Sequence, residues 1–170
     1  TLYVNLAVEI IHRWRSFDRN MSLTGTVKGI IDQLFSGLEV EYGSSFTRMC
    51  FAFITYSREG VNDTEMKDCL SLSGEVLQEV FQYSKLESFP MHVWLRLKFV
   101  MKNLVAEKES HCIKWHHRQI WEKAEERYSS LKNIAHEIMG KYFGNLIDER
   151  GRQEREIHKQ PLTLNETVVW

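Results

Sequence analysis

The chain has 170 residues, of which 43% are hydrophobic and 26% are charged, and its formal net charge at pH 7 is −1. This length can build one domain or two small ones around a real hydrophobic core. A nearly neutral chain exerts no general attraction on nucleic acid or on an acidic membrane surface, and no apolar run approaches the roughly 20 residues that span a bilayer. The composition therefore indicates a globular protein with neither a membrane span nor a nucleic-acid partner.

The cysteines and the chain ends indicate the setting of the protein. Cys50, Cys69 and Cys112 are odd in number and form no CxxC pair, which is typical of reduced thiols in a cytosolic or nuclear compartment. Of the two we expect a cytoplasmic protein. The opening residues TLYVNLAVEI lack the basic segment of a signal peptide and start inside an amphipathic pattern. The last residues, NETVVW, carry no terminating signal, so we expect the chain to be a piece of a longer protein.

The first part of the chain is predicted to be helical. Apolar residues at helical spacing predict one helix from Leu2 to about Ser16 and a second from about Val27 to a stop at Gly43. The next segment, 46–56, reads FTRMCFAFITY and is apolar on nearly every side, so periodicity does not distinguish a buried helix from a buried strand. Its flanking helices favour a helix.

A helix-turn-helix unit is predicted next, over residues 57–83. Asn62 or Asp63 is placed to cap its first helix, and Ser73 is placed to cap its second. The second helix is expected to turn Val76, Leu77, Val80 and Phe81 inward. Two short helices joined by a few residues form this kind of unit.

The remaining elements complete a recognisable order. Pro90 is expected to open a helix. The segment LVAEKESHCIKWH, 104–116, alternates loosely around a polar centre and has the size of a β-hairpin. A helical period returns at His117, a further helix is expected to end at Gly144, and the charged segment 148–159 should be solvated.

Three helices, a hairpin and a closing helix predict a mainly α fold. The prediction is a helical segment, a winged-helix domain over about residues 45–128, and a C-terminal helix. The alternative is a plain helical bundle in which the hairpin segment is only a loop.

The sequence contains no autonomous active site. Neither GxxxxGK[ST] nor a GxGxxG after a predicted strand occurs, so any phosphate-binding loop must precede Thr1, and we expect no catalytic residue and no enzyme activity in this chain. His136 and Glu137 begin a zinc-protease pattern, but Gly140 stands where its second histidine is needed. We therefore expect no metal there.

A second possible metal cluster lies around the hairpin. Cys112, His111, His116 and His117 include zinc ligand types, yet the spaced second pair of a structural zinc site is missing. A Cys–His nucleophilic pair stays open, without an identifiable residue to orient it.

DNA binding is a natural hypothesis for a winged helix, but the charge of the second helix opposes it. That helix reads SGEVLQEVFQYS, with Glu75 and Glu79 and no cation before Lys85. Carboxylates repel the phosphates that normally supply affinity. This predicts a winged helix used for contacts within its own protein.

His117 is the candidate binding residue. It lies at the start of the last helix of the winged helix, where unsatisfied N–H groups and the helix dipole favour an anion. The alternative is a core histidine bonded to a neighbouring carbonyl. His116 is expected to turn the other way.

Four blocks of the sequence resemble the winged-helix region of STAND-type NACHT ATPases, most closely those with WD or tetratricopeptide repeats, including nephrocystin-3-like members. The blocks are GTVKGIIDQLFSGLEVEYG, ITYSREGVNDTEMKDCLSLSGEVLQEVFQY, FPMHVWLRLKF and WHHRQIWEKAEERY. The resemblance implies four parts: residues 1–20 as the last helix of the NACHT module, 22–44 as a small helical domain, 45–128 as the winged helix, and 129–170 leading toward C-terminal repeats.

The resemblance also implies a function. The winged helix would close over bound ADP in the parent protein, with ADP or ATP as the parent's ligand and none bound by this chain alone. His117 matches the family position that contacts the nucleotide phosphates, and His116 replaces a usual aromatic residue, which leaves it as the less favoured candidate. The implied partners are the upstream nucleotide-binding module, the downstream repeats, and further copies of the protein on activation. A nucleic-acid-binding domain and a structural adaptor for repeats are the alternatives.

Overall fold

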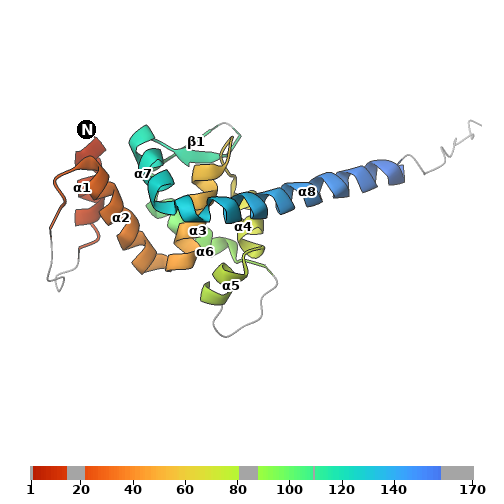
Figure 1. Cartoon of the computed structure of the whole chain (residues 1–170), viewed down its shortest axis with the longest axis horizontal. Helices are drawn as coiled ribbons and strands as arrows, with labels where there is room; N and C mark the ends of the chain where they lie inside the picture. Colours follow the sequence, from red (N-terminus) through yellow and green to blue (C-terminus); the bar gives the residue numbers. More distant parts are fainter. Residues whose placement is uncertain (1, 15–21, 81–87, 109, 158–170) are drawn as a thin grey trace, which may run out of the picture.

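A computed structural model describes residues 2–14, 22–80, 88–108 and 110–157, the last ten of these as helix backbone only. Helices dominate, and one small hairpin lies between two of them (Figure 1). In chain order the elements are α1 (Leu2–Ile11), α2 (Val27–Tyr42), α3 (Ser44–Tyr56), α4 (Asp63–Ser71), α5 (Gly74–Val80), α6 (Met91–Val100), β1 (Val105–Glu107), β2 (Ile113–Trp115), α7 (Arg118–Tyr128), the 3-10 helix η1 (Ser129–Leu131) and α8 (Lys132–Ile157).

Helix α1 is shorter than its apolar pattern predicts. It ends at Ile11, and the N–H groups of Arg13 and Trp14 bond to carbonyls only three residues back, which tightens the last turn. Arg13 then pairs with Glu41 of α2 at 3.0 Å. The expected end at Ser16 is therefore wrong, and Ser16 itself lies outside the described residues.

Helix α2 begins and ends at residues suited to those positions. The hydroxyl of Thr26 accepts a hydrogen bond from the N–H of Gly29 at 3.1 Å, which caps the start. Gly43 has a φ of +103°, a value that favours glycine, and this lets the chain pass directly from α2 into α3. The predicted stop at Gly43 is confirmed.

Helix α3 forms the centre of the fold. It packs against α2, α5, α7 and α8, so most of its faces are covered. This explains why its sequence lacks an amphipathic period, and the predicted helix is confirmed. Its buried residues are Phe46, Thr47, Met49, Cys50, Phe51, Ala52, Phe53, Ile54 and Thr55.

Helices α4 and α5 form the predicted helix-turn-helix unit. Asn62 and Glu65 make a reciprocal capping box at the start of α4, with bonds of 2.9 and 3.0 Å. Helix α5 starts directly after Ser73, whose carbonyl accepts from the N–H of Leu77. Phe81, predicted to point inward, lies outside the described residues.

The predicted hairpin is present and identifies the fold. Strands β1 and β2 pair antiparallel, with Ala106 opposite Lys114. A further bridge joins Val61 to Ile113 and attaches the hairpin to the loop before α4. Placed after the helix-turn-helix unit and α6, and directly before α7, the hairpin is the wing of a winged helix, so a plain bundle is excluded.

Helix α8 continues past its predicted end. It runs through Gly140 and Gly144 to Ile157, since a helix tolerates an isolated glycine at a cost of about 1 kcal/mol. Its far half points away from the body (Figure 1), which leaves Phe143 44% and Ile147 71% exposed. The predicted cap at Gly144 is wrong.

One continuous core joins these helices. Buried residues of α1 and α2 belong to the same cluster as those of the winged helix. Phe35 of α2 lies against Phe51 of α3 and Tyr128 of α7, with ring centroids 4.9 and 5.8 Å apart. Across the described ranges, none of the helices is both long and apolar enough to cross a membrane.

Candidate functional site

The two adjacent histidines lie at the junction of the wing and α7. His117 is the residue immediately before α7 and has extended backbone angles, φ −121° and ψ 142°. Both His116 and His117 are exposed, and their ring centroids are 4.4 Å apart in an edge-to-face arrangement. His117 is therefore not a core histidine.

Hydrogen bonds of two tryptophans hold this junction in place. The indole N–H of Trp115, the residue before the histidines, donates to the hydroxyl of Thr55 at 2.9 Å. The indole N–H of Trp121 donates to the carbonyl of the same threonine at 3.2 Å. The N–H of His116 donates to the carbonyl of Leu104 at 2.8 Å. The histidine pair thus stands on a rigid base built by α3 and the wing.

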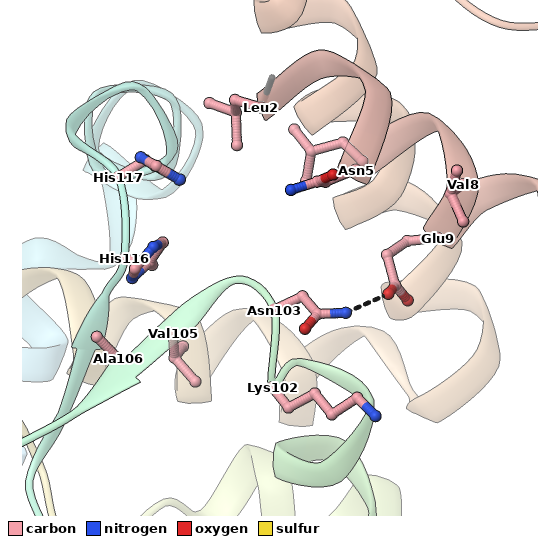
Figure 2. Close-up of a pocket in the computed structure, with 11 residues that line it drawn as sticks. Leu2, Asn5, Val8, Glu9, Lys102, Asn103, Val105, Ala106, His116 and His117 are labelled. Carbon is pink, nitrogen blue, oxygen red and sulfur yellow. Dashed lines mark hydrogen bonds between the residues drawn. The ribbon is translucent and has the colours of Figure 1, made fainter.

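A cavity of about 660 Å³, the α1–wing cavity, separates the histidine pair from α1. Figure 2 shows both imidazoles on one side and the residues of α1 on the other. Its lining residues are Leu2, Asn5, Leu6, Val8 and Glu9 from α1, and Lys102, Asn103, Val105, Ala106, His116 and His117 from the turn after α6, the wing and its end.

The lining of the α1–wing cavity mixes apolar residues with groups that can form hydrogen bonds. Lys102, Asn5 and the two imidazoles offer hydrogen-bond donors. The one acidic residue in the lining, Glu9, accepts a hydrogen bond from the amide of Asn103, which links α1 to the turn after α6. The volume lies within the range of about 300–1,000 Å³ typical of small-molecule sites.

His116 does not lie where the sequence predicted. Both histidines line the α1–wing cavity, so the expectation that His116 turns the other way is wrong. Side chains alternate along a strand, but β2 ends at Trp115, and the two histidines follow it in the irregular connection to α7.

The remaining candidate residues are dispersed. His136 and Glu137 are exposed on α8, and Glu137 pairs with Lys141 at 2.6 Å. His111 lies on the wing with a φ of 58° and contacts Glu107, while Cys112 is a half-buried free thiol. In the part of the chain that the structure describes, no three metal-ligating side chains come together.

The carboxylates of the second helix of the helix-turn-helix unit have partners inside the protein. Glu79 accepts from the N–H groups of Ser45 and Phe46, at 3.0 and 2.7 Å, and thereby caps the start of α3. Glu75 accepts from the hydroxyl of Ser45 at 2.9 Å. These contacts direct α5 toward α3. Lys85 lies outside the described residues.

Comparison with known families agrees with this geometry. A family model described as "NWD1-like, winged helix-turn-helix domain" matches residues 18–139, most of the chain. The chain belongs to this family. The match includes α2 as well as the wing, the histidine pair and the first turns of α8.

The curated proteins to which this chain is similar are much longer than the chain. The chain is 28% identical to human and mouse NACHT domain- and WD repeat-containing protein 1, over 98% of this chain and 12% of each relative. It is also 28% identical to mouse NACHT and WD repeat domain-containing protein 2, over 84% of this chain and 9% of that protein. The chain thus spans about an eighth or less of these relatives. No solved structure matches it.

The relatives' names bear on two earlier expectations. They support the resemblance to NACHT proteins that carry WD repeats. They do not mention tetratricopeptide repeats.

Sequence reasoning found the histidine pair and missed the rest of the lining. Asn5 and Asn103 are separated by nearly a hundred residues, and neither belongs to a motif. No signal in the sequence brings them together, because only the docking of α1 opposite the wing does so.

Proposed function

We propose that this chain is the regulatory winged-helix segment of a NACHT-type nucleotide-dependent switch, and that it closes over ADP held by an upstream module. The observation that carries the proposal is the exposed histidine pair facing α1 across the α1–wing cavity. Family membership supports it, since the relatives' names contain a NACHT domain. The chain itself performs no catalysis, and hydrolysis of ATP is left to the parent protein.

In this proposal His117 contacts a phosphate oxygen of ADP in the closed arrangement, and His116 is a second donor beside it. A contact made in only one state shifts the population toward that state. One charge-assisted hydrogen bond contributes about 1.5–3 kcal/mol, which corresponds to about 10- to 100-fold in the closed–open equilibrium.

Two exposed apolar faces support contacts with the rest of the parent protein. On α1, Val4 and Ile11 lie outside the lining of the α1–wing cavity and are 54% and 44% exposed, and they fit an upstream module. On α8, Phe143 and Ile147 are exposed on the projecting half and fit the segment that leads to the repeats. Closure would hide such faces, and opening would free them for self-association in the cytoplasm.

The experiment is ADP release from the full-length parent protein. His117→Ala should speed ADP release and increase the oligomeric fraction, and His116→Ala should have a smaller effect. His136→Ala, an exposed histidine on α8, is the matched control. Unchanged ADP retention in both His117→Ala and the His116→Ala/His117→Ala double variant would refute the proposal.

The DNA-binding alternative is disfavoured by the composition and contacts of α5, the helix that would enter the groove. It carries no Lys or Arg between Gly74 and Val80, and the contacts of Glu75 and Glu79 turn it toward the start of α3. Strong, salt-dependent affinity of this chain for duplex DNA would reverse this conclusion.

A further inference from the structure

A second, smaller cavity also borders His117. It has a volume of about 260 Å³, and His117 is the one residue that it shares with the α1–wing cavity. We call it the Trp121 cavity, after the tryptophan of α7 in its lining. It is lined by Ile54, Thr55, Ser57, Arg58, Lys114, Trp115, His117, Arg118 and Trp121.

The Trp121 cavity gathers cations from three separate segments. Arg58 follows α3, Lys114 belongs to β2, and Arg118 is the first residue of α7. No acidic residue occurs among its lining within the described ranges. Three cations that converge on one hollow without an anion in its lining create a local positive potential.

The nearest carboxylates only partly offset this charge. Glu59 lies 3.3 to 3.9 Å from the cationic groups of Lys108, Arg58 and Lys114, so one anion is shared by three cations. The pKa of Lys114 is lowered by its desolvation and by the neighbouring Lys108. An anion in the cavity would relieve that repulsion.

The two arginines are free to turn toward a ligand. The side chain of Arg58 is 96% exposed and that of Arg118 is 88% exposed. Arg118 bonds to Glu122 one turn along α7 at 2.7 Å, but exposed pairs of this kind contribute little and exchange readily. The Lys114 ammonium is held in place, because it donates to the backbone carbonyl of Arg58.

We propose that the Trp121 cavity binds a phosphate group. Its volume is below that of most small-molecule sites and suits an ion of phosphate size. Guanidinium groups bind phosphate oxygens in pairs, Lys114 supplies a fixed charge, and Ser57 supplies a hydroxyl donor. Free phosphate and the terminal phosphate of a nucleotide share this chemistry. Binding of a nucleotide's phosphate in this cavity rests on the proposed function, because His117 would then contact the same phosphate from the cavity edge. Binding of free phosphate does not rest on the proposed function.

The test is an NMR titration of the 170-residue chain with inorganic phosphate, against sodium chloride at matched ionic strength. The indole N–H of Trp121 and the amide of Arg118 should shift and saturate with phosphate alone. In the Arg58→Gln/Arg118→Gln variant the affinity should fall by about tenfold or more. Arg96→Gln, which removes an exposed cation on α6, should leave the affinity unchanged. Shifts that fail to saturate, or that persist unaltered in the double variant, would overturn the proposal.

Two further ligands distinguish the source of the phosphate. ADP binding more tightly than inorganic phosphate, with no response to adenosine, would identify a nucleotide's terminal phosphate; equal affinities would identify free phosphate. In the full-length parent, loss of ADP retention in His117→Ala but not in Arg58→Gln/Arg118→Gln would leave the proposed function standing and exclude the nucleotide from this cavity. Loss in both would place the nucleotide phosphate there.

Discussion

The guanidinium of Arg127 in α7 donates to both carboxylate oxygens of Glu39 in α2, with both nitrogen–oxygen distances at 3.0 Å. The same guanidinium donates to Asp32 at 2.7 Å and to Ser36 at 3.0 Å, and the hydroxyl of Tyr128 donates to Glu39 at 2.7 Å. The contact with Glu39 is the main cause of a raised Arg127 pKa, so the arginine stays charged. This network fixes α2 against the last helix of the winged helix.

Replacing Arg127 tests that network. Arg127→Met should lower the free energy of unfolding by about 1.5–3 kcal/mol, because the partly buried carboxylate of Glu39 loses its cation. Urea denaturation measures the change. Lys141→Met removes a cation from an exposed ion pair on α8 and should alter stability by less than about 0.5 kcal/mol. Equal effects of the two substitutions would show that the network contributes no more than a surface pair.

The contact between Thr55 and Trp115 anchors the wing, and Thr55→Val removes it at nearly constant volume. The hydroxyl of Thr55 accepts from the Trp115 indole at 2.9 Å and donates to the carbonyl of Phe51 at 2.6 Å. Valine would leave the buried indole N–H without a partner, at a cost of about 1–3 kcal/mol. Chemical denaturation gives the change in stability, and Thr47→Val, with a long 3.5 Å hydroxyl contact, is the comparison. A smaller loss for Thr55→Val than for Thr47→Val would contradict this role.

Gly60 lets the loop before α4 approach the wing closely. Its φ is +98°, and an added Cβ would lie 2.7 Å from the carbonyl oxygen of Ile113. Gly60→Ala should therefore destabilise the protein by more than about 1 kcal/mol. Gly140→Ala, in an open position of α8, should instead stabilise it by about 0.4–1 kcal/mol. Thermal unfolding compares the two variants, and the same sign for both would refute the argument.

The burial of the Cys69 thiol predicts that the stability of the protein depends on pH. Burial is the main cause that raises the pKa of the Cys69 thiol from 9.0 to about 12. Above pH 9.0 the thiol of Cys69 loses its proton in the unfolded chain before it does so in the folded protein. The contribution of the protonated thiol to the free energy of unfolding is therefore complete below pH 9.0 and is lost as the pH rises toward about 12. The slope is up to about 1.4 kcal/mol per pH unit.

Denaturation at several alkaline pH values measures that slope, which should be shallower in Cys69→Ala. Alkylation of the folded protein gives an independent readout. Half-buried Cys112 should react before buried Cys69 and Cys50. Preferential labelling of Cys69 in the folded protein would contradict the assignment.

The sequence by itself determined the elements whose signals are local. The capping residue Asn62, the stop at Gly43 and the alternation on either side of the wing turn are short-range patterns, and each leads to the predicted element. The predicted helix end at Gly144 is wrong because an isolated glycine costs a helix only about 1 kcal/mol, and α8 continues through it, away from the body.

Only the tertiary structure decided what the histidine pair faces. The α1–wing cavity and the Trp121 cavity are formed by residues from distant segments, and so are the contacts of Arg127 with Glu39 and of Glu79 with the start of α3. Each depends on helices that meet through their buried faces. A periodic pattern in the sequence predicts that one face of a helix is buried, but it does not predict which element covers that face. The positions of the charged groups around the histidines therefore depend on how the helices pack.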